Sequence, residues 1–294
     1  MHLYFAYGLS ICSEILLPEL IKGINIEIDI EIKKGSSNAF SQIKGKEIYR
    51  ASEQEVFRII PNIGAFLIQK GRRIVVHPAS GVDDQLFRQY LLGNALGTLF
   101  HQRGLLVLHG SAAFVDGGAI AFLGPSGSGK STFAASLCKK GHAIIADDLM
   151  VIDANTGMPL VYPAFPQVNL WPDIAESIGC DLDMLPHVVP EENKRVIRLE
   201  LGFSLDPLPL KRIYILEKGE TIEIQHLSPQ ESFIELMRNS YAVKSLISGL
   251  HLANHFSQCT KVAKDVPICR LLRPFDLKYL NDFAHVVVED IKKC

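Results

Sequence analysis

The sequence contains no pair of cysteines in a C-x-x-C arrangement, although it has six cysteines in 294 residues. Closely spaced cysteine pairs are typical of zinc sites and redox motifs, and small secreted domains carry a dense disulfide framework. Scattered cysteines favour neither arrangement. The chain is therefore expected to work in a reducing compartment, the cytoplasm.

Long apolar runs and a large excess of one charge are also missing. No stretch reaches the roughly eighteen apolar residues of a membrane span, and residues 1–20 lack the basic start and apolar core of an export signal. The formal net charge is −2, so no global basic field attracts nucleic acid. With 48% hydrophobic residues, the sequence predicts a folded protein without a membrane segment or a nucleic-acid partner.

Short runs rich in β-branched and aromatic residues fill the first eighty positions. In residues 24–32, INIEIDIEI, isoleucine alternates with polar residues, which is the period of a strand with one buried face. Gly, Pro, Ser and Asn separate the neighbouring runs. The pattern predicts an antiparallel β module over residues 1–82. The edge of its long strand is a candidate site for binding an extended peptide substrate.

The remainder, residues 83–294, is expected to form a second domain. Residues 83–103 place apolar residues at spacings of one, three and four after two acidic residues, which predicts an amphipathic helix. Two apolar strands around the turn at 116–118 follow, and then a glycine-rich loop, a helix and a buried strand. Strands alternating with helices predict the α/β (α+β) fold class.

The glycine-rich loop GPSGSGKST, residues 124–132, matches the phosphate-binding pattern G-x-x-x-x-G-K-[ST]. Its glycines let backbone N–H groups turn toward phosphate oxygens, and the following helix adds the positive end of its dipole. Lys130 is expected to reach the β- and γ-phosphates of ATP, and the Ser131 hydroxyl to ligate Mg²⁺. The candidate nucleotide-binding residues are Gly124, Pro125, Ser126, Gly127, Ser128, Gly129, Lys130, Ser131 and Thr132.

Two carboxylates, Asp147 and Asp148, end the next predicted strand, one short helix after the loop. Ligands of open α/β sheets lie at the carboxyl ends of the strands, so both carboxylates are expected beside the phosphates. One can hold the metal and the other can accept a proton from a hydroxyl nucleophile. His109 follows the apolar run LLVL, and the pattern alone leaves a structural and a functional role open.

Together, His109-Gly110, GPSGSGKST and GHAIIADD at 141–148 resemble the catalytic domain of the bacterial HPr kinase/phosphorylase family. That family pairs an H-G element with the phosphate loop and places a G-H-x-h-x-A-D-D strand, where h is apolar, one helix later. The resemblance covers roughly residues 104–153. It implies a fold like that of phosphoenolpyruvate carboxykinase, a need for Mg²⁺, and transfer of the γ-phosphoryl group of ATP to a protein serine.

The resemblance also implies roles for individual residues. Lys130 and the loop backbone would bind the phosphates, while Ser131 and Asp148 would hold the metal. Asp147 would be the general base that takes the serine proton, and His109 would lie close to the transferred group. The roles of Asp147 and Asp148 could be exchanged.

Four further segments are similar to HPr-kinase-like proteins found with lasso-peptide biosynthesis, which phosphorylate a terminal serine of a precursor peptide. These segments are YGLSICSEILLPEL (7–20), NLWPD (169–173), KRVIRL (194–199) and LLRPFDL (271–277). The expected partner is therefore a protein or peptide bearing a serine, such as a lasso precursor, and a homo-oligomer is left open. The N-terminal domain and C-terminal loop of the bifunctional family members have no match, so phosphorylase activity is not implied.

Two other function classes fit the same loop. A small-molecule kinase would use the same site on a metabolite hydroxyl, and a regulatory ATPase would hydrolyse ATP without an acceptor.

Charged and aromatic residues outside these motifs have ordinary structural interpretations. Lys194, Arg195 and Arg273 are expected to be solvated charges, although an arginine could contact phosphate. His251 and His255 are expected on a helix surface and Trp171 in the core.

Overall fold

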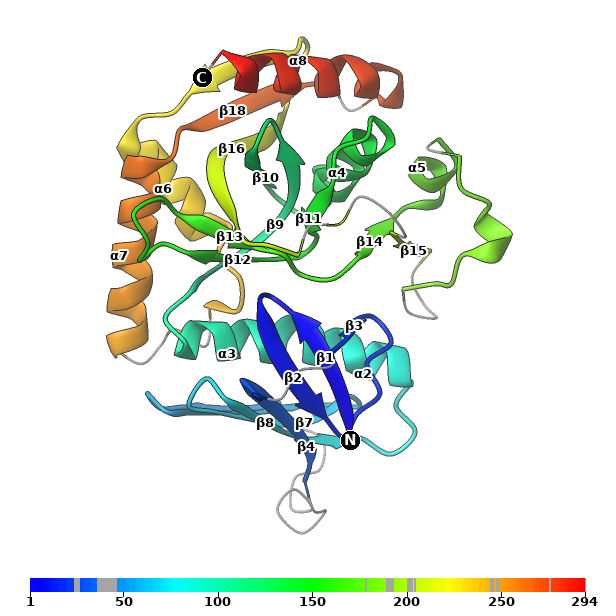
Figure 1. Cartoon of the computed structure of the whole chain (residues 1–294), viewed down its shortest axis with the longest axis vertical. Helices are drawn as coiled ribbons and strands as arrows, with labels where there is room; N and C mark the ends of the chain where they lie inside the picture. The colour runs from blue at the N-terminus through cyan, green and yellow to red at the C-terminus, as the bar shows by residue number, and fades with distance from the viewer. Residues whose placement is uncertain are drawn as a thin grey trace. The chain divides into compact units, whose positions relative to one another are not determined.

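The computed structural model describes residues 1–23, 27–35, 47–177, 179–188, 193–199, 203, 205–243, 246, 249–274 and 276–293. It divides into two compact units, each made of two chain segments (Figure 1). The first unit contains residues 1–107 and 241–257. The second contains residues 108–240 and 258–294. Strands and helices in both units confirm the predicted α/β fold class.

The first unit is built on a sheet whose strands run in the order β3-β1-β2-β4-β8-β7-β6-β5. Neighbouring strands are antiparallel, except that β4 pairs in parallel with both β2 and β8. The predicted β module is therefore present as a mixed sheet. Its strands are β1 His2–Ala6, β2 Leu9–Ser13, β3 Ile21–Lys22, β4 Ile30–Lys34, β5 Ile48–Ala51, β6 Glu55–Ile60, β7 Gly64–Gln69 and β8 Arg73–Pro78.

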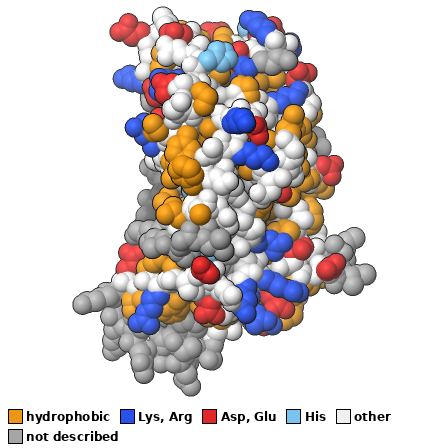
Figure 2. All heavy atoms as spheres, turned by 90° about the vertical axis from the view of Figure 1, so that its left-hand side faces the viewer, with side chains coloured by type: hydrophobic (Ala, Val, Ile, Leu, Met, Phe, Trp, Pro, Cys, Tyr) orange, Lys and Arg blue, Asp and Glu red, His pale blue; other side chains and the backbone are white. Residues whose placement is uncertain are grey.

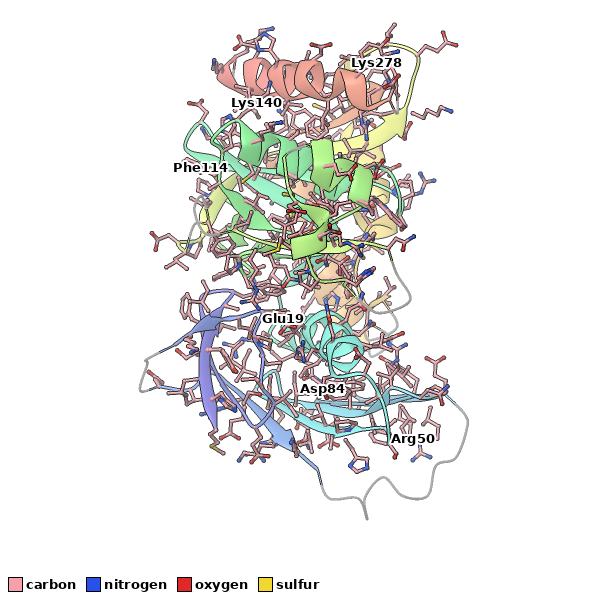
Figure 3. The ribbon with its side chains drawn as sticks, turned by 90° about the vertical axis from the view of Figure 1, so that its right-hand side faces the viewer. Glu19, Arg50, Asp84, Phe114, Lys140 and Lys278 are labelled. Carbon is pink, nitrogen blue, oxygen red and sulfur yellow. The ribbon has the colours of Figure 1, made fainter. Side chains whose placement is uncertain are left out.

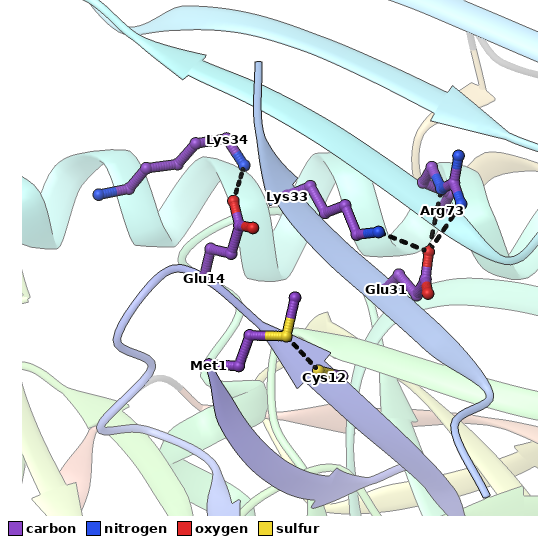
Figure 4. A network of polar contacts seen from close by, with 7 residues as sticks. All are labelled: Met1, Cys12, Glu14, Glu31, Lys33, Lys34 and Arg73. Carbon is purple, nitrogen blue, oxygen red and sulfur yellow. Dashed lines mark hydrogen bonds and ion pairs between the residues drawn. The ribbon is translucent and has the colours of Figure 1, made fainter. Parts of the chain in front are cut away.

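The strand expected over residues 24–32 is β4, which begins later, at Ile30. Residues 24–26 of that prediction lie outside the described residues. The alternation is as predicted, because Ile30 and Ile32 are buried while the Glu31 carboxylate reaches Arg73 and Lys33 at 2.8 and 3.4 Å (Figure 4). β4 is not an edge strand, since β2 and β8 pair with it on both sides. Peptide binding by the β module stays a prediction.

The predicted helix over 83–103 is present as three successive helices, α2 Asp84–Tyr90, the π-helix η1 Leu91–Ala95 and α3 Leu96–Gln102. Asp83 caps its start by accepting a hydrogen bond from Leu86 N at 2.8 Å. Phe87 stacks on Phe66 of β7, with ring centroids 5.3 Å apart. Because this face packs on the sheet, the helices belong to the first unit, and the division after residue 107 does not coincide with the boundary expected after residue 82.

The second unit contains a strongly curled sheet. Its strands run in the order β10-β9-β12-β13-β16-β18-β17, β11 pairs with β9, and β10 also pairs with β16, which closes a circuit through β9, β12 and β13. The strands are β9 Leu106–Val115, β10 Gly118–Leu123, β11 Ile144–Ala146, β12 Leu149–Asp153, β13 Leu160–Tyr162, β16 Leu208–Lys218, β17 Glu223–His226 and β18 Ile268–Arg273. A separate ribbon pairs β14 Gln167–Leu170 with β15 Arg195–Arg198.

Helices α4 and α8 cover β10 and β16 with a fully buried apolar core. Phe133 of α4 lies between Phe122 of β10 and Phe283 of α8, at centroid distances of 4.7 and 6.2 Å. Burying aromatic side chains of this size fixes the strand and the helix that flank the glycine-rich loop. The helices of this unit are α4 Lys130–Lys139, α5 Pro172–Ser177, η2 Leu182–Met184, α6 Pro229–Arg238, α7 Gly249–Asp265, η4 Leu277–Tyr279 and α8 Leu280–Lys292, of which α7 begins in the first unit.

The helix α7 carries histidines on its buried face and apolar side chains on its exposed face. The prediction of surface histidines is wrong, because His251 and His255 are 7% and 1% exposed. Leu252 and Phe256, one position further along, are exposed instead. Figure 2 turns the side of the molecule that carries α7 toward the viewer, and hydrophobic side chains lie among charged ones there. None of the described helices is long and apolar enough to cross a membrane.

Within the first unit, the buried histidines meet His101 of α3. The rings of His101 and His255 lie edge to face at 5.7 Å, and His101 Nε2 lies 2.8 Å from the backbone oxygen of Tyr241. His251 Nε2 lies 2.6 Å from the backbone oxygen of Glu53. Burial lowers the pKa of His101 and that of His255 to about 4. Both rings are therefore neutral in the folded protein near pH 7.

Acidification should destabilise the first unit. The unfolded chain protonates both histidines below about pH 6.5, whereas the folded chain does so only near pH 4. Stability is therefore complete above pH 6.5 and falls toward pH 4, by up to roughly 3 kcal/mol for each histidine. Urea unfolding followed by circular dichroism at pH 7 and pH 5 measures the loss. The variant His255→Gln should lose less than the parent, and an equal loss would contradict this origin.

Candidate functional site

The glycine-rich loop connects β10 directly to α4 and wraps around the side chain of Lys130. The Lys130 Nζ donates hydrogen bonds to the backbone oxygens of Gly124 and Pro125, at 2.9 and 3.1 Å. Gly124, Gly127 and Gly129 have positive φ angles of 142°, 81° and 90°. Residues other than glycine rarely adopt positive φ angles, which explains why glycine occupies these three positions.

The interior of the loop has an unmet capacity for hydrogen bonds. Ser128 is buried, and its hydroxyl has no hydrogen-bond partner among the described residues. A Cβ atom at Gly124 would lie 2.9 Å from this hydroxyl, so the loop closes tightly here. Burial lowers the pKa of Lys130, while the nearby charges of Asp148 and Asp147 raise it. A cationic group and donors converge, as a phosphate-binding loop requires.

The carboxylate of Asp147 is held by two hydrogen-bond donors, one on β9 and one on β14. It accepts hydrogen bonds from Ser111 Oγ at 2.6 Å and from Asn169 N at 3.1 Å, and the nearby Ser131 hydroxyl also favours its charged form. Burial raises the pKa of Asp147, and these donors oppose the shift. The carboxylate of Asp147 and the hydroxyl of Ser131, in the first turn of α4, are therefore two neighbouring oxygen groups that could ligate a metal.

The carboxylate of Asp148 faces a cavity and pairs with His109. His109 Nδ1 lies 3.1 Å from Asp148 Oδ1, and the Asp148 side chain is 51% exposed. Burial alone would raise the pKa of Asp148. The hydrogen bond from His109 and the charges of His109, Lys194 and Lys130 have the larger effect, so the pKa of Asp148 is lowered. Asp148 has a φ of 68°, a left-handed conformation that Asp tolerates better than most residues. Such strain is frequent at functional sites.

One cavity of about 340 Å³ joins this pair to the loop. His109, Asp148 and Lys130 all line it, so the structure brings three of the four predicted catalytic residues to one space. Asp147 is hydrogen-bonded to two residues of the lining, Ser111 and Asn169. Among the predicted loop residues, the lining contains Ser126, Gly127, Gly129, Lys130, Ser131 and Thr132. Gly124, Pro125 and Ser128 form the back of the loop through the contacts given above.

Arg273, expected to be a solvated charge, is 7% exposed and supports the loop. Its Nη2 donates to the backbone oxygen of Ser128 at 2.6 Å, and its guanidinium lies 5.1 Å from the ring centre of Phe283. A Cβ atom at Gly129 would lie 2.4 Å from the same Nη2. The contact therefore requires glycine at position 129.

The prediction of a core tryptophan is also wrong, because Trp171 is 47% exposed and lines the cavity. Lys194 Nζ lies 5.4 Å from its ring centre, a cation–π contact, and lines the cavity as well. The adjacent Arg195 instead turns to the ring of His187. Trp171 directly follows β14 and Lys194 directly precedes β15, so residues next to both strands of this ribbon contribute side chains to the site.

Sequence reasoning missed Asn239, which connects two parts of the site. Its side-chain oxygen accepts a hydrogen bond from Gly124 N at 2.9 Å, and its backbone oxygen accepts one from His109 N at 2.7 Å. Its own Nδ2 is held by the backbone oxygen of Glu235 at 2.8 Å. Asn239 follows the end of α6, far from the motif, so no local signal identified it.

The oxygen donors of the site fit a magnesium ion. Mg²⁺ prefers oxygen ligands and usually takes only one or two from the protein, with phosphate and water completing the shell. Ser131 and Asp147 provide such a pair, and Asp148 lies on the cavity side. Within the described residues no group of three or more His, Cys, Asp or Glu side chains could hold a metal alone.

Comparisons with known proteins give structural likenesses but no sequence match. No protein-family model matches the chain, and no curated protein sequence matches it. Among solved structures it is similar to the Hpr(Ser) kinase/phosphatase from Coxiella burnetii, at 12% identity and a TM-score of 0.35. The alignment covers 64% of this chain and 97% of that one. Function therefore has to be argued from the site itself.

Replacing Gly129 should damage the loop more than replacing Gly127. Both have left-handed φ angles, but a Cβ at Gly127 would meet nothing within 4 Å, whereas one at Gly129 would displace Arg273 from Ser128. We expect Gly129→Ala to weaken binding of a fluorescent ATP analogue at least about tenfold, and Gly127→Ala by roughly fivefold or less.

A double-mutant cycle tests the cause. If the clash is responsible, Arg273→Ala should weaken ATP binding less in the Gly129→Ala background than in the parent. Additive losses, or equal effects of the two glycine variants, would contradict the contact-based explanation.

Proposed function

We propose that this chain is an ATP-dependent kinase that transfers the γ-phosphoryl group to a serine hydroxyl of a protein or peptide. The observation that carries the proposal is the Asp148–His109 pair, 3.1 Å apart, in the same cavity as Lys130 and the glycine-rich loop. A nucleotide loop alone is compatible with many reactions. A half-exposed carboxylate beside it adds a group that can accept a proton from an incoming alcohol.

The loop supplies the donor side of the reaction. Its backbone N–H groups, the start of α4 and Lys130 would hold the phosphates of ATP, and the Ser128 hydroxyl would gain a partner. When the nucleotide binds, Lys130 would exchange its bonds to Gly124 and Pro125 for phosphate oxygens. Burial of the ammonium group strengthens its interaction with a phosphate, because little water screens it.

In the proposed reaction, Asp147 and Ser131 ligate the metal and Asp148 accepts the serine proton. This exchanges the roles of the two aspartates that the family resemblance implies. This choice is supported by the position of Asp147, which is close enough to the Ser131 hydroxyl, the expected Mg²⁺ ligand, for that group to lower its pKa, and which does not line the cavity. Asp148 lines the cavity, and His109 orients it. Magnesium, when bound, would neutralise charge on the phosphate oxygens.

Asp148 can take part in transfer only as the carboxylate. Its lowered pKa keeps it ionised at neutral pH, so it can accept the serine proton as the serine oxygen bonds to phosphorus and ADP leaves. His109 would keep the carboxylate oriented through its hydrogen bond to Asp148 Oδ1. Lys130 would balance the charge on the transferred group.

The acceptor is proposed to be a peptide, with a lasso precursor as the specific candidate and the cytoplasm as the compartment. Three segments that are similar to the lasso-associated kinases each contribute to the cavity lining. They do so through Trp171, Lys194 and Arg273. These side chains line the same cavity as the catalytic pair, so they are suited to contact an acceptor or a nucleotide.

Substituting the two aspartates separates their roles. Asp148→Asn should lower kcat at least about a hundredfold with ATP affinity within a few-fold, because the base is lost and Asn accepts the left-handed backbone. Asp147→Asn should instead raise the Mg²⁺ concentration for half-maximal activity. Steady-state kinetics across ATP and Mg²⁺ concentrations measure both. The reverse pattern would return the base role to Asp147, and parent-like activity of both variants would refute the site.

The acceptor class can be tested with labelled ATP and mass spectrometry. We expect phosphoserine on a peptide that ends in serine, none on the same peptide with that serine replaced by alanine, and little ADP without acceptor. Phosphorylation of free serine only would identify a small-molecule kinase. Equal ADP release with and without acceptors would identify an ATPase.

A further inference from the structure

A second cavity, of about 230 Å³, lies entirely within the first unit. One face of β5, β6 and β7 contributes half of its lining residues, and the helical segment and residues 242–243 contribute the other half. The apolar part of this face consists of Val56, Ile60, Phe66 and Ile68. Cross-strand pairing aligns Val56 with Ile68, so these side chains form a continuous apolar surface.

Two polar groups on this face have unmet hydrogen-bonding capacity. Tyr49 and Arg58 are direct cross-strand partners and both line the cavity. Arg58 donates from Nη1 to Asn94 Oδ1 at 3.0 Å and from Nη2 to Glu47 Oε1 at 3.1 Å. Its Nε and the Tyr49 hydroxyl are buried and have no partner among the described residues. Buried donors are nearly always satisfied, so a pair of unsatisfied ones beside a cavity indicates a ligand.

The helical wall of the cavity has unusual backbone geometry. Asn94 and Ala95 belong to the π-helix η1, a wide turn that is frequent at functional sites. A Cβ at Gly93 would lie 2.7 Å from the Tyr241 hydroxyl, so a larger residue there would have to displace the Tyr241 side chain. Ala242, which also lines the cavity, has a left-handed φ of 50°. Strain at two segments of one cavity supports a binding role.

We propose that this cavity binds a hydrophobic group of side-chain size that carries a carboxylate. Arg58 Nε can only donate, and an oxygen anion is the acceptor that a guanidinium group binds best. Burial raises the pKa of Tyr49 to about 12, so its hydroxyl keeps its proton and can donate as well. Glu47 is 46% exposed, so water screens its repulsion of the anion.

The size of the cavity limits the ligand. Whole small-molecule sites usually measure roughly 300–1,000 Å³. This cavity measures about 230 Å³, so its ligand must be smaller than a typical small molecule. Two sources fit the chemistry, a free hydrophobic carboxylic acid and the C-terminal residue of a peptide. The site is independent of the proposed kinase reaction, because all its lining residues belong to the first unit.

Methyl NMR of the full chain can detect this binding. The probes are 4-methylpentanoate, its amide, and the peptide Gly-Gly-Leu with a free or an amidated C-terminus. We expect saturable shifts of the Ile60 and Ile68 methyl signals with at least one carboxylate, and at least about tenfold weaker binding of its amide. Saturation by the free acid alone identifies a small-molecule ligand, and saturation by the peptide alone identifies a chain terminus.

Matched variants assign the contact. Arg58→Gln should weaken binding about tenfold or more, and Tyr49→Phe, which keeps the ring, should weaken it about threefold or more. Arg50→Gln should bind like the parent, because Arg50 is exposed on the same strand, next to Tyr49 and on the opposite face (Figure 3). Thermal unfolding checks that each variant folds. Absence of saturable shifts up to about 10 mM of either carboxylate, or parent-like binding by Arg58→Gln and Tyr49→Phe, would overturn the proposal.

Discussion

A buried ammonium group determines the geometry of the second unit's site. Lys130 is 6% exposed, and moving a cation out of water is costly unless dipoles and anions surround it. The carbonyls of Gly124 and Pro125 and the charges of Asp147 and Asp148 provide this environment. The loop therefore has to turn around the ammonium group, and its glycines, the neighbouring aspartates and the supporting side chains follow from that requirement.

The loop and its flanking elements could be predicted because their signals are local. The strand before it, the helix after it and the paired aspartates lie within about thirty residues, and each has its own periodicity or turn chemistry. The supports of the loop could not be predicted. Asn239 and Arg273 reach it only through the tertiary arrangement of α6 and β18, which a pattern of local periods does not encode. Buried polar residues such as these look like surface residues in a sequence.

Alternation in the first unit predicted which side chains are buried but not which strands pair. Ile30 and Ile32 are buried as expected. Alternation predicts only which face of a strand is buried, and it does not predict which strands lie beside it. Parallel pairing with β2 and β8 leaves β4 without a free edge. The same limit applies to His251 and His255, because a helix with polar residues on one face can still bury that face against other polar groups.

The first unit is discontinuous in sequence, and this affects how the protein can be made. Residues 241–257, which include His251 and His255, are synthesised only after residues 108–240 of the second unit. The N-terminal sheet therefore lacks this segment, and stays partly uncovered, while more than a hundred further residues are synthesised. During that interval its apolar surface is a natural target for chaperones, and fragments that stop after residue 107 would retain this exposed intermediate permanently.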